Sequence, residues 1–208
     1  MVIDLGLRWP LAAGLVGLVL MVAGCGGVEA PTGDALYVDA KPRYERFAET
    51  VHVALMAAHE GVWQVAQNDH GAAPLACDAA KGYKFSARLV AQISASAMSA
   101  SLDAADDALQ GVGLETRRQS LGSGEDREDQ LLASGDGIDR LVMVARPQAG
   151  VIRVSADGEC APGSAHDLRN MVFGKKRDTS AWQRLPATEG PEWVPQFYFP
   201  PDGPVYYN

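Results

Sequence analysis

The sequence predicts an α+β domain: a mostly antiparallel sheet with two helices packed on one face, held by one disulfide. Three observations lead to this fold class. Two segments carry apolar residues at helical three- and four-residue spacing, and several others alternate or run apolar as strands do. The last two of these strands are joined by a short turn. Because hairpins dominate the second half of the chain, the sheet is expected to be mainly antiparallel.

The first predicted helix begins near Pro42, with Asp39 as its N-terminal cap, and Gly61 is a natural stop for it. Its apolar stripe consists of Tyr44, Phe47, Ala48, Val51, Ala54, Leu55 and Ala58. This stripe is expected to face the sheet.

Residues 62–67 form a short segment rich in β-formers that ends at a turn cluster, residues 68–71. A loop carrying Pro74 and Cys77 is expected next. From Tyr83 to Ile93 apolar and polar residues alternate, which makes this the clearest strand in the chain.

Residues 96–110 return to helical spacing, with a stripe of Met98, Leu102, Ala105 and Leu109 that ends at Gly111. Residues 114–121 are predicted to form a strand, and residues 122–129 an acidic, glycine-containing loop. Two apolar strands, residues 138–145 and 151–156, flank a turn at residues 147–150 and predict a β-hairpin.

The N-terminus carries a targeting signal. The apolar run of residues 11–22 is shorter than the roughly 20 residues that span a bilayer, and small residues and a cysteine follow it. Val22, Ala23, Gly24 and Cys25 resemble the lipobox of bacterial lipoproteins at all four positions. That resemblance implies cleavage before Cys25, acylation of its sulfur with palmitate-type chains, and anchoring on the extracytoplasmic face of the cell membrane. The alternatives are an ordinary cleaved signal and an uncleaved membrane helix.

The predicted organisation follows from this signal. Residues 1–24 form the signal peptide, residues 25–38 a lipid-anchored tether, residues 39–160 the α+β domain, and residues 161–208 an irregular C-terminal extension. With Cys25 acylated, Cys77 and Cys160 remain, and a lone pair of cysteines outside the cytoplasm is expected to form a disulfide. Two free thiols or a metal site are the alternatives, although paired ligand spacing is lacking.

The C-terminal segment combines aromatic residues with prolines from Pro186 to Pro204, a density that prevents regular helix. Either this segment packs across the domain or it presents aromatic anchors to a partner, since aromatic residues are enriched at binding hot spots. The candidate partner-binding residues are Trp193, Phe197, Tyr198, Phe199, Tyr206 and Tyr207.

No metal or cofactor site is predicted. His52 and His59 lie one heptad apart but have no third ligand, and Asp103, Asp106 and Asp107 lie on or near the solvent face of a helix. Calcium needs six or more oxygen ligands, usually from a loop, so a solvated helix face is the expected state of these aspartates. We find no nucleophile elbow, Ser-x-x-Lys, phosphate-binding loop or His-Glu-x-x-His motif, and no catalytic residue is assigned. A triad assembled from scattered residues stays open as an alternative, because triads are defined by geometry and not by spacing.

The net charge of −8 argues against a phosphate-binding surface and against nucleic acid as a partner. Abundant arginine, alanine and glycine are typical of high-GC bacteria and favour an actinobacterial source. The opening helix, the cysteine before a tyrosine-led strand, and the Ser-Ala-Asp-x-x-Cys run from Ser155 to Cys160 resemble the small LppA-like lipoproteins of actinobacteria. This resemblance implies no activity and no cofactor.

The expected function is therefore a membrane-anchored, non-enzymatic binding or accessory module of the cell envelope, which contacts an envelope protein or a small ligand. Two alternatives stay open. One is an envelope hydrolase with an unrecognised site, which needs a pocket holding a histidine and a carboxylate. The other is a carrier of lipid or another small ligand, which needs a large apolar cavity.

Overall fold

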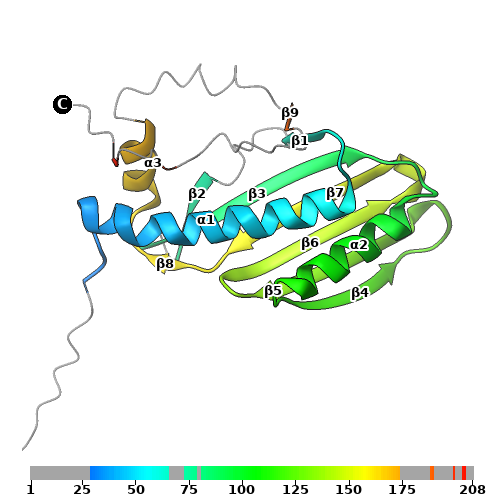
Figure 1. Ribbon diagram of the computed structural model, residues 1–208, viewed down its shortest axis with the longest axis horizontal. Coiled ribbons are helices and arrows are strands. Elements are labelled where there is room, and N and C mark those ends of the chain that lie inside the picture. The colour runs from blue at the N-terminus through cyan, green and yellow to red at the C-terminus, as the bar shows by residue number, and fades with distance from the viewer. Residues whose placement is uncertain are drawn as a thin grey trace, which may run out of the picture.

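A computed structural model of the chain describes residues 29–65, 73–78, 81–173, 188–189, 199 and 203–204 (Figure 1). The predicted α+β class is confirmed: helices pack on an antiparallel sheet, and a disulfide joins Cys77 to Cys160. The predicted signal peptide and Cys25 lie outside the described residues. Of the helices within these ranges, none combines the length and the apolar character that crossing a bilayer requires.

The described strands form one nine-stranded sheet in the order β4-β5-β6-β7-β3-β1-β9, and β2 and β8 pair with the start of β3. Every pairing among them is antiparallel. The strands are β1 (Trp63–Val65), β2 (Ala73–Cys77), β3 (Gly82–Gln92), β4 (Glu115–Leu121), β5 (Glu128–Gly135), β6 (Ile138–Arg146), β7 (Val151–Gly158), β8 (Ala161–Pro162) and β9 (Thr188–Glu189).

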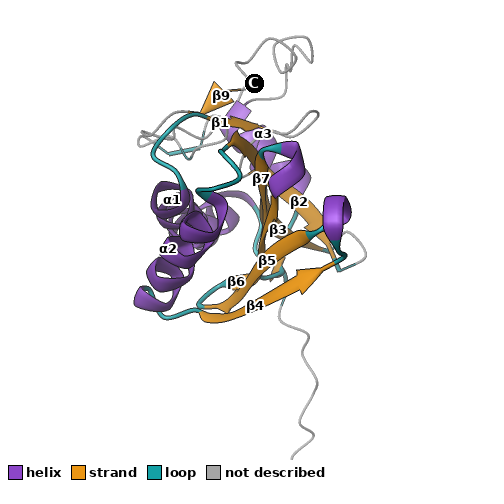
Figure 2. Cartoon of the chain, turned by 90° about the vertical axis from the view of Figure 1, so that its right-hand side faces the viewer, coloured by secondary structure: helices purple, strands orange, loops and turns teal. Residues whose placement is uncertain are grey.

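Two helices, α1 (Gly33–Ala58) and α2 (Met98–Gly111), lie side by side on one face of this sheet (Figure 2). The sheet turns its alternate apolar side chains toward them, for example Leu89, Val154 and Met143, which are directly paired in register. Each core residue lies between Leu36 and Phe199. A chain beginning at residue 26 therefore contains the complete described core.

Helix α1 begins at Gly33, before the predicted start near Pro42, and runs through the proline. Proline removes one helical hydrogen bond and crowds the carbonyl four residues earlier, here that of Val38. Val38 is 70% exposed, so water can reach that carbonyl. Leu36 and Ala40 in the added turns are completely buried, and their burial offsets the cost of the proline.

Three segments differ from the expected loops. The loop around Pro74 and Cys77 is strand β2, and the end of the expected acidic loop is the start of β5, after a 3₁₀ turn at Gly124–Asp126. The expected irregular extension contains helix α3 (Ala165–Phe173), which contacts β2 and α1 (Figure 1). Ser164 Oγ accepts a hydrogen bond from the Asp167 N–H and caps the start of α3.

The β6–β7 hairpin has the predicted position. A 3₁₀ turn at Pro147–Ala149 is followed by Gly150 at φ 65°, a left-handed conformation that glycine adopts readily. The pairing runs from Arg146 with Val151 back toward Ile138, where a bulge at Asp139 shifts the register. The hairpin thus places β7 beside β3, so that its exit reaches the disulfide.

Candidate functional site

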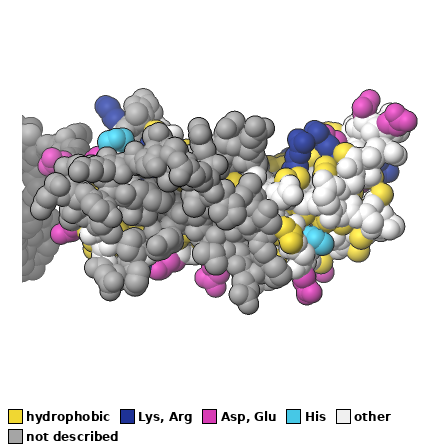
Figure 3. Space-filling model, turned by 90° about the horizontal axis from the view of Figure 1, so that it is seen from above, with side chains coloured by type: hydrophobic (Ala, Val, Ile, Leu, Met, Phe, Trp, Pro, Cys, Tyr) yellow, Lys and Arg dark blue, Asp and Glu magenta, His cyan; other side chains and the backbone are white. Residues whose placement is uncertain are grey.

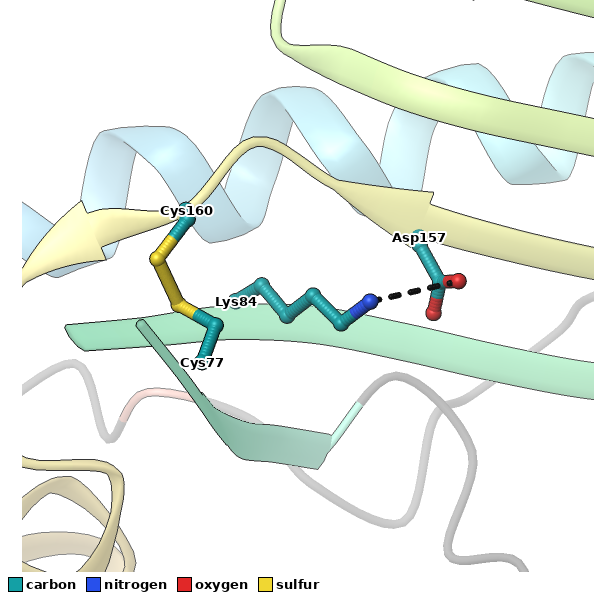
Figure 4. Close-up of a disulfide and its surroundings, with 4 residues drawn as sticks. All are labelled: Cys77, Lys84, Asp157 and Cys160. Carbon is teal, nitrogen blue, oxygen red and sulfur yellow. Dashed lines mark ion pairs between the residues drawn. A yellow bond between two sulfur atoms is a disulfide. The ribbon is translucent and has the colours of Figure 1, made fainter. Parts of the chain in front are cut away.

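The disulfide joins β2 to the segment that follows β7, and it closes across the first residue of β3 (Figure 4). The Cα atoms of Cys77 and Cys160 are 6.0 Å apart, within the normal range for a disulfide. Gly82 is paired with Cys77 in the ladder, and a Cβ added to it would lie 2.7 Å from Cys160 Sγ. Glycine at this position is therefore a packing requirement of the disulfide.

The predicted aromatic site is only partly within the described residues. Phe199 is 7% exposed, and its ring lies 4.9 Å from that of Tyr37 and 5.3 Å from that of Tyr44, centre to centre. Of the two alternatives left open for this segment, Phe199 itself packs on the domain, because its ring lies against aromatic side chains of α1 and β3. Outside the described residues lie Trp193, Phe197, Tyr198, Tyr206 and Tyr207.

The face of the sheet opposite α1 and α2 is here called the outer face. Strand alternation places on it Lys84, Ser86, Arg88 and Val90 of β3, Arg153, Ser155 and Asp157 of β7, Arg140, Val142, Val144 and Arg146 of β6, Glu128, Gln130, Leu132 and Ser134 of β5, and Glu115, Arg117, Gln119 and Leu121 of β4. One row crosses the sheet from Arg117 through Leu132, Val142 and Ser155 to Arg88.

Asp157 is the buried acid of the outer face, at 4% exposure. Its Oδ2 accepts from Lys84 Nζ at 3.3 Å and from an Arg140 guanidinium nitrogen at 3.2 Å, and the first of these pairs is drawn in Figure 4. Burial alone opposes ionisation, but the Ser86 hydroxyl, the Lys84 ammonium and the Arg140 guanidinium outweigh it. The pKa of Asp157 is therefore lower than usual, and the carboxylate stays charged.

A contact between a carboxylate and a phenol lies on the helix side of the sheet. Tyr83 is 1% exposed, and its hydroxyl donates to Asp39 Oδ2 at 3.2 Å. Arg43 Nε donates to the same oxygen, also at 3.2 Å. Burial, followed by the charge of Asp39, raises the pKa of Tyr83 well above its usual value, so this phenol stays protonated and ties β3 to α1.

Two of the three aspartates of α2, Asp103 and Asp106, take part in structural contacts. Asp103 pairs with Arg118 of β4 at 2.7 Å, and Asp106 accepts from Gln110 at 2.7 Å and from the Thr116 hydroxyl at 2.5 Å. Across the described ranges no group of three or more His, Cys, Asp or Glu side chains is arranged to hold a metal. These contacts attach α2 to the edge strand β4.

A histidine–carboxylate pair occurs on α3, where His166 Nδ1 lies 3.4 Å from Asp167 Oδ1. The two side chains are 72% and 51% exposed. The nearby Ser164 hydroxyl accepts a backbone hydrogen bond at the helix start. This pair therefore lies on open surface, without the water-excluding pocket that a hydrolase needs.

Two hollows in the described part of the chain bear on the alternative of a ligand carrier. An open hollow of about 440 Å³ lies on the outer face, lined by Leu132 and Ser134 between Arg117 and Arg140, with Glu115 and Asp139 at its edge. A hollow of about 80 Å³ lies between α1 and the β6–β7 end of the sheet, lined by Arg43, Arg46, Phe47, Tyr83, Phe85 and Glu159. The first is open and is bordered by charged side chains, and the second is too small for an acyl chain, so neither favours a lipid carrier.

Comparison with protein-family profiles and with curated protein sequences finds no match. Among solved structures, the chain is similar to a crystal structure of the lipoprotein candidate LppA from Mycobacterium tuberculosis. The two share 14% sequence identity at a TM-score of 0.41, over 78% of this chain and 90% of the other. A similarity at this level carries no argument about function.

Proposed function

We propose that this chain is an extracytoplasmic lipoprotein of the cell envelope, anchored to the membrane through an acylated Cys25, and that its folded domain is a non-enzymatic binding or accessory module. The observation that carries the proposal is the four-residue lipobox Val22-Ala23-Gly24-Cys25 after a 12-residue apolar run. The α1 helix begins at Gly33, which leaves a short connection between the proposed anchor and the domain.

The disulfide supports the same location. Cys77 and Cys160 are 83 positions apart in sequence, yet they meet across β3. Structural disulfides persist in oxidising compartments and are rare in the cytoplasm of most organisms. A secreted, lipid-anchored chain gives this pair the environment in which it would remain oxidised.

Two acyl chains are the physical basis of the anchor. Each buried methylene contributes about 0.8 kcal/mol, and one chain alone gives only marginal attachment, whereas two give stable attachment. A diacylglyceryl group on Cys25 would supply two chains. The domain itself would then need no apolar membrane-inserting element.

The test is metabolic labelling with radioactive palmitate in a bacterial host, followed by membrane fractionation. Cys25→Ala is expected to lose the label and to accumulate as unprocessed precursor. The matched control is the double variant Cys77→Ala/Cys160→Ala, which removes the other two cysteines and is expected to keep the label. An unlabelled wild-type chain, or a label that depends on Cys77 and Cys160, would contradict the proposal.

A further inference from the structure

Charge is distributed unequally between the two sides of this acidic protein. The described strands place six cations on the outer face: Lys84, Arg88, Arg117, Arg140, Arg146 and Arg153. They place three carboxylates there, those of Glu115, Glu128 and Asp157, while Asp139 lies at the bulge beside them. The helix side differs, because α1 and α2 together carry seven acidic residues and three basic ones.

Part of this positive charge is not neutralised locally. Arg140 and Lys84 share Asp157, and Arg146 pairs with Glu128. Arg117 and Arg153 are exposed, and within the described ranges no carboxylate forms an ion pair with either side chain. These two arginines lie on different strands, with β5 and β6 between them.

Aliphatic side chains separate the cations. Val90, Val142, Val144 and Leu132 are partly exposed in the rows that carry Arg88, Arg117 and Arg153. Seen from above in Figure 3, a group of dark-blue basic side chains lies right of centre near the upper edge of the molecule, with yellow apolar and magenta acidic side chains beside it. A sheet face that combines guanidinium groups with short aliphatic side chains suits a broad anionic surface. The reason is that one guanidinium group can donate two parallel hydrogen bonds to two oxygens of a phosphate group.

We propose that the outer face docks on the anionic phospholipid headgroups of the membrane in which the chain is anchored. This inference rests on the proposed lipid anchor, because the anchor brings the face and the membrane together. Gly33 lies eight positions after Cys25, and an extended chain over eight positions spans about 28 Å at most. Helix α1 lies one layer from the sheet, about 10 Å, so the connection is long enough for the outer face to reach the headgroups.

The expected strength follows from the cations. A lysine or arginine close to an anionic membrane strengthens binding about fivefold. Replacing two unpaired arginines by glutamate is therefore expected to weaken binding at least about 25-fold. Raising the ionic strength from about 0.1 M to about 1 M shortens the Debye length from about 10 Å to about 3 Å and should release the protein.

The experiment uses residues 26–208, which contain the whole described core and lack Cys25, so that acylation plays no part. Co-sedimentation is measured with vesicles of phosphatidylcholine alone and with vesicles that also contain phosphatidylglycerol. The test variant is Arg117→Glu/Arg153→Glu. The matched control is Lys41→Glu/Arg46→Glu, which makes the same change of charge on the helix side. Thermal melts establish that all three chains are folded.

Salt-sensitive binding to the anionic vesicles, lost in the outer-face variant and kept in the control, would support the proposal. Equal binding to both vesicle types would overturn it, as would equal loss in the two variants. Absence of vesicle binding would also overturn it, and would leave an acidic protein as the ligand of this face. Palmitate labelling tests the lipid anchor separately. Loss of the label would contradict the anchor, whereas loss of vesicle binding would contradict the docking face.

Discussion

At the level of single residues, Asp157 shows what the pattern of polar and apolar residues in the sequence can and cannot predict. Alternation around β3 identifies Lys84 and Ser86 as facing away from the helices, on a side of the sheet that is expected to be exposed to solvent. The register places Ser86 opposite Asp157, and the ion pairs then join this acid to Lys84 and Arg140. The partners of Asp157 lie on two other strands, β3 and β6, so they depend on tertiary register and no local motif encodes them.

The ionised state of Asp157 gives a pH dependence of stability. Its folded pKa lies below the ordinary value of 3.8, so the stabilising contribution is present above pH 3.8 and is lost as the pH falls through the folded pKa. Asp157→Asn is expected to lower the free energy of unfolding at neutral pH by about 1.5–3 kcal/mol, the range for a hydrogen bond to a charged group.

The measurement is urea unfolding of wild type and variant between pH 3 and pH 7. The difference between the two should be constant near neutrality and should shrink below pH 3.8. Asp139→Asn, at the exposed bulge, is the control and should change little at any pH. A difference that grows on acidification would contradict the assignment of a charged Asp157.

At the level of elements, the strongly periodic segments were predicted and the capped or charged ones were missed. Strand β3 and helix α2 follow their apolar patterns closely. Strand β5 was missed because its first three residues, Glu128, Asp129 and Gln130, are polar and lie beside the edge strand. Helix α3 had a readable signal, since Ser164 and Asp167 form a cap before the apolar Leu168 and Met171.

The sequence places the start of α1 too late, near Pro42, because proline disfavours a helix interior and the burial of Leu36 and Ala40 depends on the fold. Pro42 lies inside the helix, so its replacement should stabilise the protein. Pro42→Ala is expected to raise the free energy of unfolding by about 1–3 kcal/mol, up to the full difference in helix propensity. Lys41→Ala, one position earlier, is the control and should shift it by less than about 0.5 kcal/mol. Thermal and urea unfolding of the two variants measure this, and an unchanged or lower value for Pro42→Ala would contradict a continuous helix from Gly33 to Ala58.

At the level of the whole molecule, the fold class and the cysteine pairing were predictable, whereas the charged surface was not. The net charge of −8 suggested that no surface would bind phosphate. That value averages over both sides, while the sheet gathers arginines from β3, β4, β6 and β7 on the outer face. The aromatic C-terminal segment is a second example. From composition alone, both packing on the domain and docking of a partner stayed open, and only the fold places Phe199 against Tyr37 and Tyr44.

The proposed protein is an oxidised domain tethered to the membrane by an acylated cysteine. Intact mass spectrometry of the wild-type protein, extracted from bacterial membranes and measured before and after reduction, tests both parts at once. The account predicts a chain that begins at Cys25, carries a diacylglyceryl group, and gains two hydrogens when the bond between Cys77 and Cys160 is reduced. A lipid-free chain, or one whose mass does not change on reduction, would contradict it.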